Sequence, residues 1–311
     1  MMKSRQTIKQ WKYKRYFQFI RHASAKKVYN LLRAAFYWIK GDGILKSKPA
    51  FLRVEISRKC EVKCLYCLEP KENLFYPFED YKTLIDKLQN YIFLVSLYEI
   101  GEPLENENIV DYIKYANSRN IGTIISTNLS ISKPDTFWKN LVLSGLDRIV
   151  VAIDGITEAV YKQYRTNGNY ELVISNLKKI IMFKEINKSH IQIEWQMIDL
   201  PWNKSQQNDA RKYSKEIGCS EFRLIEEVTS IRRKYKFSDY IRKKNCKLSF
   251  FTFNVTAYNK VRPCTKIYNE NVIVGDLSVN SFDDIWNGKE IQAIRNKGAI
   301  MNRPGCKTCH E

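Results

Sequence analysis

Residues 51–67 read FLRVEISRKCEVKCLYC, and this stretch decides the fold and the chemistry expected of the chain. It begins with a short apolar run, residues 51–56, that is typical of a buried strand. Cys60, Cys64 and Cys67 follow directly with the spacing C-x3-C-x2-C. Three thiolates this close together can bind three irons of a cubane cluster and leave the fourth iron without a protein ligand. The stretch therefore predicts a strand that ends at an iron-sulfur site with one open metal position.

A zinc site and a disulfide are the alternatives for these three cysteines. Structural zinc normally takes four protein ligands, and no histidine or fourth cysteine lies near the loop. No segment has the apolar core of a cleavable signal or the roughly 18 apolar residues of a membrane span, so we expect a cytoplasmic protein. Because thiols stay reduced there, the eight cysteines of the chain favour metal or redox chemistry over disulfides.

The sequence after this stretch alternates between short apolar runs and helical patterns. The runs lie at 92–99, 122–126, 148–153, 191–197 and 221–225, and the helical patterns lie at 84–92, 109–118, 136–143, 172–186 and 207–217. Strands joined by helical crossovers imply a parallel sheet. The sequence therefore predicts an α/β fold in which residues 49–230 form a partial (β/α)6 TIM-type barrel.

Two further modules are expected at the ends of the chain. Residues 231–311 contain a predicted β-hairpin at 250–255 and 260–263, and a helix that begins after Ser281. Residues 1–48 form a basic extension in which apolar residues recur at helical spacing from Val28 to Ile39, and Gly41 ends that helix.

The charge of the chain is strongly positive and concentrated in the N-terminal extension. The net charge is +19, and Asp42 is the only acidic residue before position 50. Such an arm, with its aromatic residues Trp11, Tyr13, Tyr16, Phe17 and Phe19, can bind an anionic membrane or RNA, or it can pack against the barrel. Packing is the favoured interpretation. A peripheral contact at the inner membrane surface is the second, and no specific nucleic acid is predicted.

The cysteine triplet, with Tyr66 before its last member, resembles the motif of the radical S-adenosylmethionine (SAM) superfamily. Three later elements resemble other motifs of that family, and each follows a successive predicted strand. These are Ile100-Gly101-Glu102-Pro103, similar to GGEP; Ser126-Thr127-Asn128, similar to Thr-Asn-Gly with Leu129 next; and Ala152-Ile153-Asp154-Gly155, similar to Ser-Ile-Asp-Gly and followed by Tyr164-Arg165. The chain departs from the family pattern at Ile100, Leu129 and Ala152.

This resemblance implies a set of cofactors and site residues. Cys60, Cys64 and Cys67 would hold a [4Fe-4S] cluster whose open iron binds SAM. The residues implied in SAM binding are Tyr66, Gly101, Glu102, Pro103, Ser126, Asn128, Asp154 and Arg165. Cleavage of SAM would then produce a 5'-deoxyadenosyl radical.

Four more cysteines, Cys246, Cys264, Cys306 and Cys309, lie near the C-terminus and can saturate one metal centre. By ligand number alone, tetrahedral zinc suits them as well as iron. The run of residues 275–287 between them resembles the SPASM/twitch extension of radical SAM enzymes, in the twitch form of aminocyclitol dehydrogenases. The resemblance implies a second, auxiliary [4Fe-4S] cluster.

Taken together, these features predict a radical SAM oxidoreductase. The expected substrate is a small polar molecule such as a sugar, an aminocyclitol or a lipid-linked compound. The auxiliary cluster would accept an electron, and a flavodoxin or ferredoxin would donate the electron that cleaves SAM. Maturation of a ribosomal peptide is the main alternative, although residues 1–48 are shorter than a leader-binding domain commonly is. A basic arm that binds a membrane or RNA is a third hypothesis.

The residues that contact substrate are expected on the fifth and sixth strands. Glu194 and Gln196 alternate with apolar neighbours, so one face of the fifth strand is polar and can line the barrel cavity. Arg223 lies on the sixth strand in the same kind of pattern. These three are candidates for a general base or a hydrogen-bond anchor, and a purely structural role is the alternative. Cys219 is expected to be a small buried residue rather than a reactive thiol.

Overall fold

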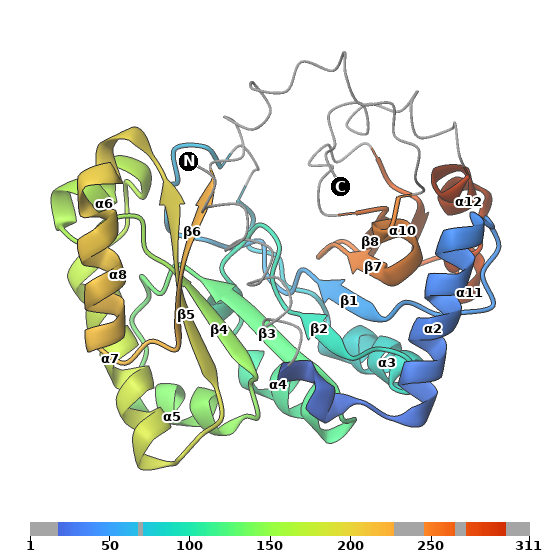
Figure 1. Cartoon of the computed structure of the whole chain (residues 1–311), viewed down its shortest axis with the longest axis horizontal. Helices are drawn as coiled ribbons and strands as arrows, with labels where there is room; N and C mark the ends of the chain where they lie inside the picture. The colour runs from blue at the N-terminus through green and yellow to red at the C-terminus, as the bar shows by residue number, and fades with distance from the viewer. Residues whose placement is uncertain (1–17, 68–70, 227–245, 265–271, 297–311) are drawn as a thin grey trace.

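The computed structural model describes residues 18–67, 71–226, 246–264 and 272–296. Figure 1 shows a single curved sheet that runs through the molecule, with helices on its outer face. Cys306 and Cys309 lie outside the described residues, as do Trp11, Tyr13, Tyr16 and Phe17. Everything below refers to the described part.

The sheet has the strand order β6-β5-β4-β3-β2-β1-β7-β8-β9. All neighbours from β6 to β7 are parallel, and β8 and β9 continue the sheet antiparallel. The strands are β1 (Phe51–Val54), β2 (Leu94–Ser96), β3 (Gly122–Thr127), β4 (Arg148–Ala152), β5 (Gln192–Asp199), β6 (Glu221–Glu226), β7 (Thr252–Val255), β8 (Lys260–Arg262) and β9 (Gly275–Asp276). The α/β fold with a partial barrel is thus confirmed.

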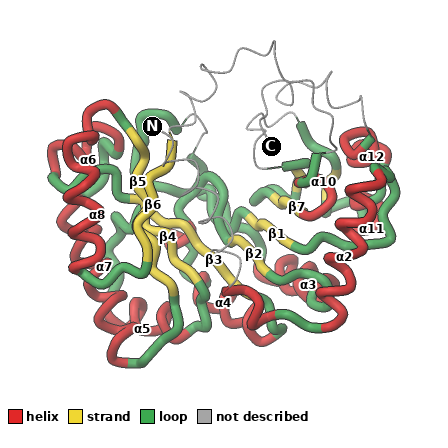
Figure 2. Tube along the Cα trace, viewed as in Figure 1, coloured by secondary structure: helices red, strands yellow, loops and turns green. Residues whose placement is uncertain are grey.

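Helices connect these strands and cover the outer face, as the secondary-structure colours of Figure 2 show. The barrel helices are α3 (Phe78–Leu88), α4 (Ile109–Ser118), α5 (Asp135–Leu143), α6 (Glu158–Tyr164), α7 (Tyr170–Ile186) and α8 (Gln207–Glu216). The short helix α6 was not expected from the sequence. Apolar residues of alternate strand positions, such as Ile125, Val151 and Trp195, pack under these helices in the main core.

The other face of the sheet forms the barrel lumen. The N-terminal extension closes the end of the lumen at which the parallel strands begin. Leu94, Ile124 and Val150 form a small separate cluster with Phe19, which lies in the 3-10 helix η1 (Gln18–His22). An added Cβ at Gly122 would lie 2.6 Å from the Phe19 ring, so only glycine leaves room for this side chain. Phe19 therefore packs against the barrel, but on the lumen side of the strands and not on the exterior expected from the sequence. Phe19 and the rest of η1 are called the plug.

A buried polar contact fixes the plug below the strands. His22 Nε2 lies 2.9 Å from Asp147 Oδ1, and Arg21 reaches the same oxygen at 2.8 Å. Asp147 Oδ2 accepts a hydrogen bond from the backbone of Thr123 at the start of β3. The extension is thereby bound to the loop that precedes β4.

The C-terminal residues extend the barrel sheet. β7 pairs with β1 over its whole length, from Phe51 opposite Thr252 to Val54 opposite Val255. The expected hairpin is present, and its first strand also becomes the seventh parallel strand of the sheet. The short helices α10 (Leu248–Phe251) and α12 (Lys289–Arg295) and the strand β9 were not predicted, whereas α11 (Phe282–Trp286) begins after a Ser281 capping box as expected.

The segment between residues 43 and 47 connects the N-terminal extension to these C-terminal helices. Trp286 Nε1 donates to Ser47 O at 2.7 Å. The fully buried Arg295 donates to Gly43 O and Ser249 O, and its guanidinium lies 4.3 Å from the centre of the Trp286 ring. The boundaries predicted near residues 48 and 230 remain predictions.

Helix α2 (Ala25–Lys40) lies at the edge of this region beside α11 and α12 (Figure 1). It ends at Gly41 as expected, with φ of 83°, in the left-handed region that favours glycine. Tyr37 and Trp38 of this helix pack against the main core, whereas five other large apolar residues are exposed: Val28, Tyr29, Leu32, Phe36 and Ile39. None of the helices in the described ranges has the length and apolar character that a bilayer span requires.

Candidate active site

The three cysteines of the first motif lie in the loop after β1, at the carboxyl end of the parallel strands. None of the cysteines in the described residues forms a disulfide. The loop is held by backbone hydrogen bonds to the segment after α6, because Leu65 N donates to Tyr164 O at 2.8 Å and Thr166 N donates to Lys63 O at 2.9 Å. The loop is thus positioned from across the barrel.

Each of the three thiols has a nitrogen donor beside it, and each donor comes from a different part of the chain. Asn128 Nδ2 lies 3.5 Å from Cys60 Sγ, Arg165 Nη1 lies 3.6 Å from Cys64 Sγ, and Lys71 Nζ lies 3.0 Å from Cys67 Sγ. Hydrogen bonds and positive charge next to the sulfurs stabilise thiolates that ligate a metal. This donor set fits an iron-sulfur cluster.

Burial affects the protonation of these thiols in the metal-free chain. Burial raises the pKa of Cys60 to about 11 and also raises the pKa of Cys64. Because ligation requires thiolates, cluster assembly must release their protons. Within the described residues no group of three or more His, Cys, Asp or Glu side chains is placed to hold one metal ion, and a cubane needs none because each thiolate binds a different iron.

The predicted Gly-Glu-Pro element follows β2 and lies directly against the cluster loop. An added Cβ at Gly101 would lie 2.1 Å from Ser57 O, so the two backbones approach too closely for any other residue. Glu102 N donates to Lys59 O at 2.8 Å. Pro103 begins the 3-10 helix η2 (Pro103–Glu105), which turns the chain away from the loop. The element therefore fixes the position of the residue before Cys60.

The carboxylate of Glu102 is buried and connects the segments after β2 and β3. Oε1 accepts from Leu104 N at 3.1 Å, and Oε2 accepts from Asn128 N at 2.7 Å after β3. Burial raises the pKa of Glu102 to about 7, although these backbone donors oppose the shift. A buried carboxylate of this kind can accept the ammonium group of an amino acid.

The predicted elements after β3 and β4 also reach this edge of the sheet. Leu129, which replaces the glycine of the family pattern, has φ of 58°, the left-handed region that favours glycine. Asp154 is fully buried, and its Oδ2 accepts from Arg165 Nε at 2.8 Å and lies 2.7 Å from Nη2. Asp154 Oδ1 accepts from Ile198 N, so this carboxylate holds Arg165 and β5 together. Ser126 lies on the lumen side of β3, and Tyr66 is exposed and packs edge-on against Tyr164.

The candidate substrate residues form one ion network on the lumen face. Arg148 Nη1 lies 2.7 Å from carboxylate oxygens of both Glu194 and Glu221. Arg223 Nε lies 2.6 Å from the other oxygen of Glu194, and Arg223 also donates to Gln196 Oε1. Glu194 is buried between two guanidinium groups, whereas Arg223 is partly exposed to the lumen.

Several polar residues of the site were missed by sequence reasoning. Arg53 pairs with Glu99 at 2.8 Å and lies over the Tyr98 ring on the lumen side. Arg148 is the one charged residue of an otherwise apolar strand, a signal that the sequence offered. Lys71 carries no such signal, because nothing in its neighbourhood distinguishes it from a surface lysine. Cys219 packs against the core as predicted, and burial raises its pKa to about 12.

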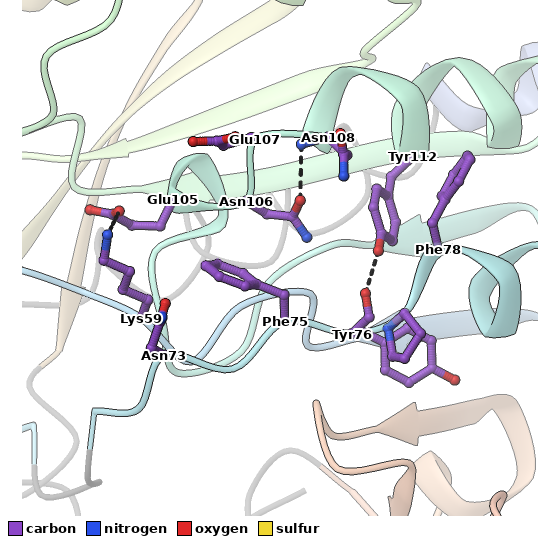
Figure 3. A pocket seen from close by; sticks show the side chains of 11 residues that line it. Lys59, Asn73, Phe75, Tyr76, Phe78, Glu105, Asn106, Glu107, Asn108 and Tyr112 are labelled. Atoms are coloured by element: carbon purple, nitrogen blue, oxygen red, sulfur yellow. Dashed lines mark hydrogen bonds and ion pairs between the residues drawn. The ribbon is translucent and has the colours of Figure 1, made fainter.

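A separate cavity of about 430 Å³ lies behind the cluster loop, and Figure 3 shows it from close by. Its walls come from Lys59, the segment 73–78 and the segment 105–112, with Lys59 paired to Glu105 at 2.9 Å. Neither the three thiols nor the lumen residues line it. This cavity is therefore separate from the cysteine loop and from the lumen face.

Of the auxiliary cysteines, Cys246 and Cys264 fall within the described residues. Cys264 is buried directly after β8, and Cys246 lies just before α10, where Ser249 Oγ donates to Cys246 O at 2.9 Å. Both are therefore placed by the two segments that flank the hairpin.

A cysteine trio with nitrogen donors, at the carboxyl edge of a partial TIM barrel, defines a class of iron-sulfur enzymes. The comparisons with known proteins identify the family within that class. Residues 54–184 match the radical SAM superfamily, and residues 246–310 match SPASM, an iron-sulfur cluster-binding domain. The chain therefore carries a radical SAM domain and a C-terminal SPASM-type domain. Its cofactors are a [4Fe-4S] cluster, an auxiliary cluster and SAM.

Similar solved structures support the fold. The chain matches Streptococcus suis SuiB bound to precursor peptide SuiA with a TM-score of 0.68 and 15% identity, covering 90% of this chain and 74% of that one. It matches BtrN in complex with AdoMet and 2-DOIA with a TM-score of 0.54 and 16% identity, covering 86% of this chain and 95% of that one.

Curated relatives match a smaller region. A GTP 3',8-cyclase of Clostridium perfringens is 29% identical over 138 residues, which is 42% of each chain. An Fe-coproporphyrin III synthase of Methanosarcina barkeri is 26% identical over 136 residues, which is 42% of this chain and 34% of that one. The match thus spans less than half of the length of these relatives.

The first test concerns the ligands of the SAM-binding cluster. Replacing Cys60, Cys64 and Cys67 together by alanine should lower the iron content of the reconstituted protein from about eight to about four per chain, because one cubane is lost. Iron and sulfide are counted after anaerobic reconstitution. The control is Cys219→Ala, which should keep about eight irons. Equal iron loss in both variants, or none in the triple variant, would contradict the assignment.

A second test uses the buried carboxylate of Glu102. Between pH 4.5 and about 7, Glu102 keeps its proton in the folded chain but has released it in the unfolded chain. The free energy of unfolding therefore falls as pH rises through this range. The free energy of unfolding of the cluster-free chain should lose about 3 kcal/mol more over this range than that of Glu102→Gln. Urea denaturation at several pH values measures it. The exposed control Glu107→Gln should retain the wild-type slope, and identical slopes in all three proteins would exclude the effect.

Proposed function

We propose that this chain uses SAM to remove a hydrogen atom from a small polar substrate in the barrel lumen, and that the net reaction is an oxidation. When bound, the cluster and SAM supply a 5'-deoxyadenosyl radical that takes hydrogen from a C–H bond. The observation that carries the proposal is the charged lumen face formed by Arg53, Arg148, Glu194 and Arg223 on the barrel strands. Such a face suits a substrate with several polar groups.

The residues around the cluster would orient SAM. Glu102 offers a buried carboxylate for the amino group, and its contacts with the segments after β1 and β3 hold it in place. Arg165 presents a guanidinium beside Cys64, and the two-point contact with Asp154 fixes its plane. We assign Asp154 a positioning role because it is fully buried and its Oδ2 contacts the Arg165 guanidinium at two points.

In the lumen, we assign Arg223 to substrate contact and Glu194 to positioning. Both carboxylate oxygens of Glu194 are occupied by the guanidinium groups of Arg148 and Arg223. Arg223 is more exposed than Glu194. In the sheet register, Arg223 on β6 lies opposite Gln196 on β5, and Gln196 lies opposite Ala152 on β4. Ala152 comes two residues before Asp154 in the chain. A molecule that contacts Arg223 would therefore lie deeper in the lumen than SAM. Sugars and aminocyclitols have hydroxyl groups that suit this arginine and Gln196.

The auxiliary domain supports an oxidation. The β7–β8 hairpin that leads to Cys264 pairs directly with β1, the strand that leads to Cys60. Cys60 and Cys264 therefore follow strands of the same hydrogen-bonded sheet, an arrangement that favours electron transfer between centres held at these two cysteines. Loss of a hydrogen atom from the substrate, followed by loss of a proton and of one electron to the auxiliary cluster, amounts to a two-electron oxidation. A flavodoxin or ferredoxin in the cytoplasm would supply the electron for SAM cleavage.

Modification of a ribosomal peptide is the second candidate function. The match to the SuiB structure covers 90% of this chain, and that structure contains a precursor peptide. The same clusters and the same loss of hydrogen atom, proton and electron would serve a peptide substrate. A peptide would gain a crosslink or another change of mass, which separates the two candidates.

The test of the proposal follows hydrogen from substrate to cofactor. Reconstituted protein is incubated with SAM, dithionite and deuterated aminocyclitols, sugars or peptides, and 5'-deoxyadenosine is analysed by mass spectrometry. We expect deuterium in 5'-deoxyadenosine with one aminocyclitol or sugar. Deuterium transfer from peptides alone would favour the second candidate, and no 5'-deoxyadenosine from fully loaded protein would contradict both.

Arg223→Gln provides the matching variant. A hydrogen bond to a charged group contributes about 1.5–3 kcal/mol, so substrate-dependent turnover should fall about 10- to 100-fold while substrate-free SAM cleavage stays unchanged. Arg211→Gln is the control, because Arg211 is exposed on α8 and stacks at 4.7 Å on the outer side of the same strand, over Phe222. Equal rates for the two variants would remove Arg223 from the substrate site.

A further inference from the structure

The first half of helix α2 turns polar residues toward the protein, whereas Tyr37 and Trp38 near its end pack against the main core. Lys27 and Asn30 are buried together with Ala34. Asn30 exchanges two hydrogen bonds with the backbone of Lys48, at 3.0 and 2.8 Å, and Lys27 Nζ donates to Asn120 O. These contacts fix the rotation of the helix about its axis. The outward direction of its other face is therefore a built feature of the fold.

The outward face of α2 is a continuous apolar stripe. The exposed fractions are 63% for Tyr29, 64% for Leu32, 60% for Phe36 and 77% for Ile39, and Val28 is also exposed. Their spacing of three or four residues places them on one side of the helix. Single exposed apolar residues are common, but a whole exposed stripe marks a surface that contacts something apolar. The stripe formed by residues 28, 29, 32, 36 and 39 is called the α2 stripe below.

A row of basic residues runs beside the α2 stripe. Lys26, Arg33 and Lys40 are seven residues apart and so lie on one line along the helix. The helix contains no acidic residue, and Asp42 after its end pairs with Lys40 at 3.1 Å. Residues 1–17 lie outside the described residues, and their sequence has six basic side chains and no acidic one. Apolar and cationic groups therefore meet along the same exposed edge.

We propose that the α2 stripe and its basic row bind the surface of an anionic phospholipid bilayer. A helix that lies in a membrane interface places Leu, Phe and aromatic side chains among the acyl chains and its Lys and Arg side chains at the headgroups. Each basic residue near an anionic surface adds to the attraction. In Figure 1, α2 lies at the outer edge of the fold, on the side away from β4–β6, so docking leaves the lumen face uncovered.

Charge complementarity favours this partner over two others. A second copy of the chain would bring its own basic row against this one, and residues 1–17 carry only positive charge, so both would repel the helix edge. RNA would pair with the basic row but would leave the α2 stripe in water. An anionic bilayer is the partner that satisfies both features.

The test measures sedimentation of the full reconstituted protein with vesicles. Phosphatidylglycerol–phosphatidylcholine vesicles should bind it, vesicles of phosphatidylcholine alone should bind it at least tenfold more weakly, and 0.5 M salt should weaken the binding. Phe36→Ser and Leu32→Ser should each reduce binding about tenfold or more, because each removes one large apolar side chain from the acyl region. Val279→Ser is the control, since Val279 is 77% exposed elsewhere on the surface.

Three results would overturn the proposal. The first is no binding of the wild type to anionic vesicles. The second is vesicle binding that Phe36→Ser and Leu32→Ser leave unchanged, which would assign the binding to charge alone. Competition by single-stranded RNA would then test whether RNA is the ligand of the basic row. The third is a dimer in analytical ultracentrifugation that these two substitutions dissociate, which would assign the α2 stripe to a second copy. Because the stripe is exposed, the substitutions should leave the thermal unfolding and the SAM cleavage of the protein unchanged.

Discussion

The site depends on one close approach between two backbone segments. Gly101 lies against Ser57 so tightly that no Cβ fits, and the next residue, Glu102, bonds through its backbone to Lys59 and through its side chain to Asn128. The ends of β1, β2 and β3 are thereby joined at one point, immediately beside Cys60. A cluster loop without secondary structure of its own gains a fixed position from this contact. The buried carboxylate of Glu102 is the functional group that the same contact places next to the cluster.

The second organising feature is the continuity of the sheet. The strand β7 continues the barrel at β1, so the hairpin that leads to Cys264 is attached to the strand that carries the first cluster loop. Arg295 and Trp286 then bind the C-terminal helices to residues 43–47, and the plug formed by Phe19 closes the other end of the lumen. The N-terminal extension therefore closes one end of the lumen, and the C-terminal strands extend the barrel sheet. A reaction that needs a dry, shaped cavity would benefit from a lumen closed at this end.

Much of the fold and the site was predictable from the sequence, for identifiable physical reasons. Helix α4 and strands β3 and β4 have clear periodicity and turn residues at their ends, so their predicted positions agree closely with the structure. Cys60 was singled out by the cysteine spacing, and Gly101, Asn128 and Asp154 by their resemblance to family motifs. Each follows a predicted strand, and parallel strands bring their carboxyl ends together. The pairing of β7 with β1 could not be predicted, because the residues of a short apolar strand do not specify its neighbour. The orientation of α2 was equally hidden, since its spacing shows an apolar face but not which way that face turns.

The central claim is that one iron beside Cys60, Cys64 and Cys67 is open and binds SAM. Electron-nuclear double resonance of the reduced protein, with SAM labelled by 15N in its amino group and 17O in its carboxylate, tests this directly. We predict hyperfine coupling from both labels to one of the two clusters, and loss of that coupling in Cys64→Ala. Tight SAM binding without coupling to either cluster would contradict the account.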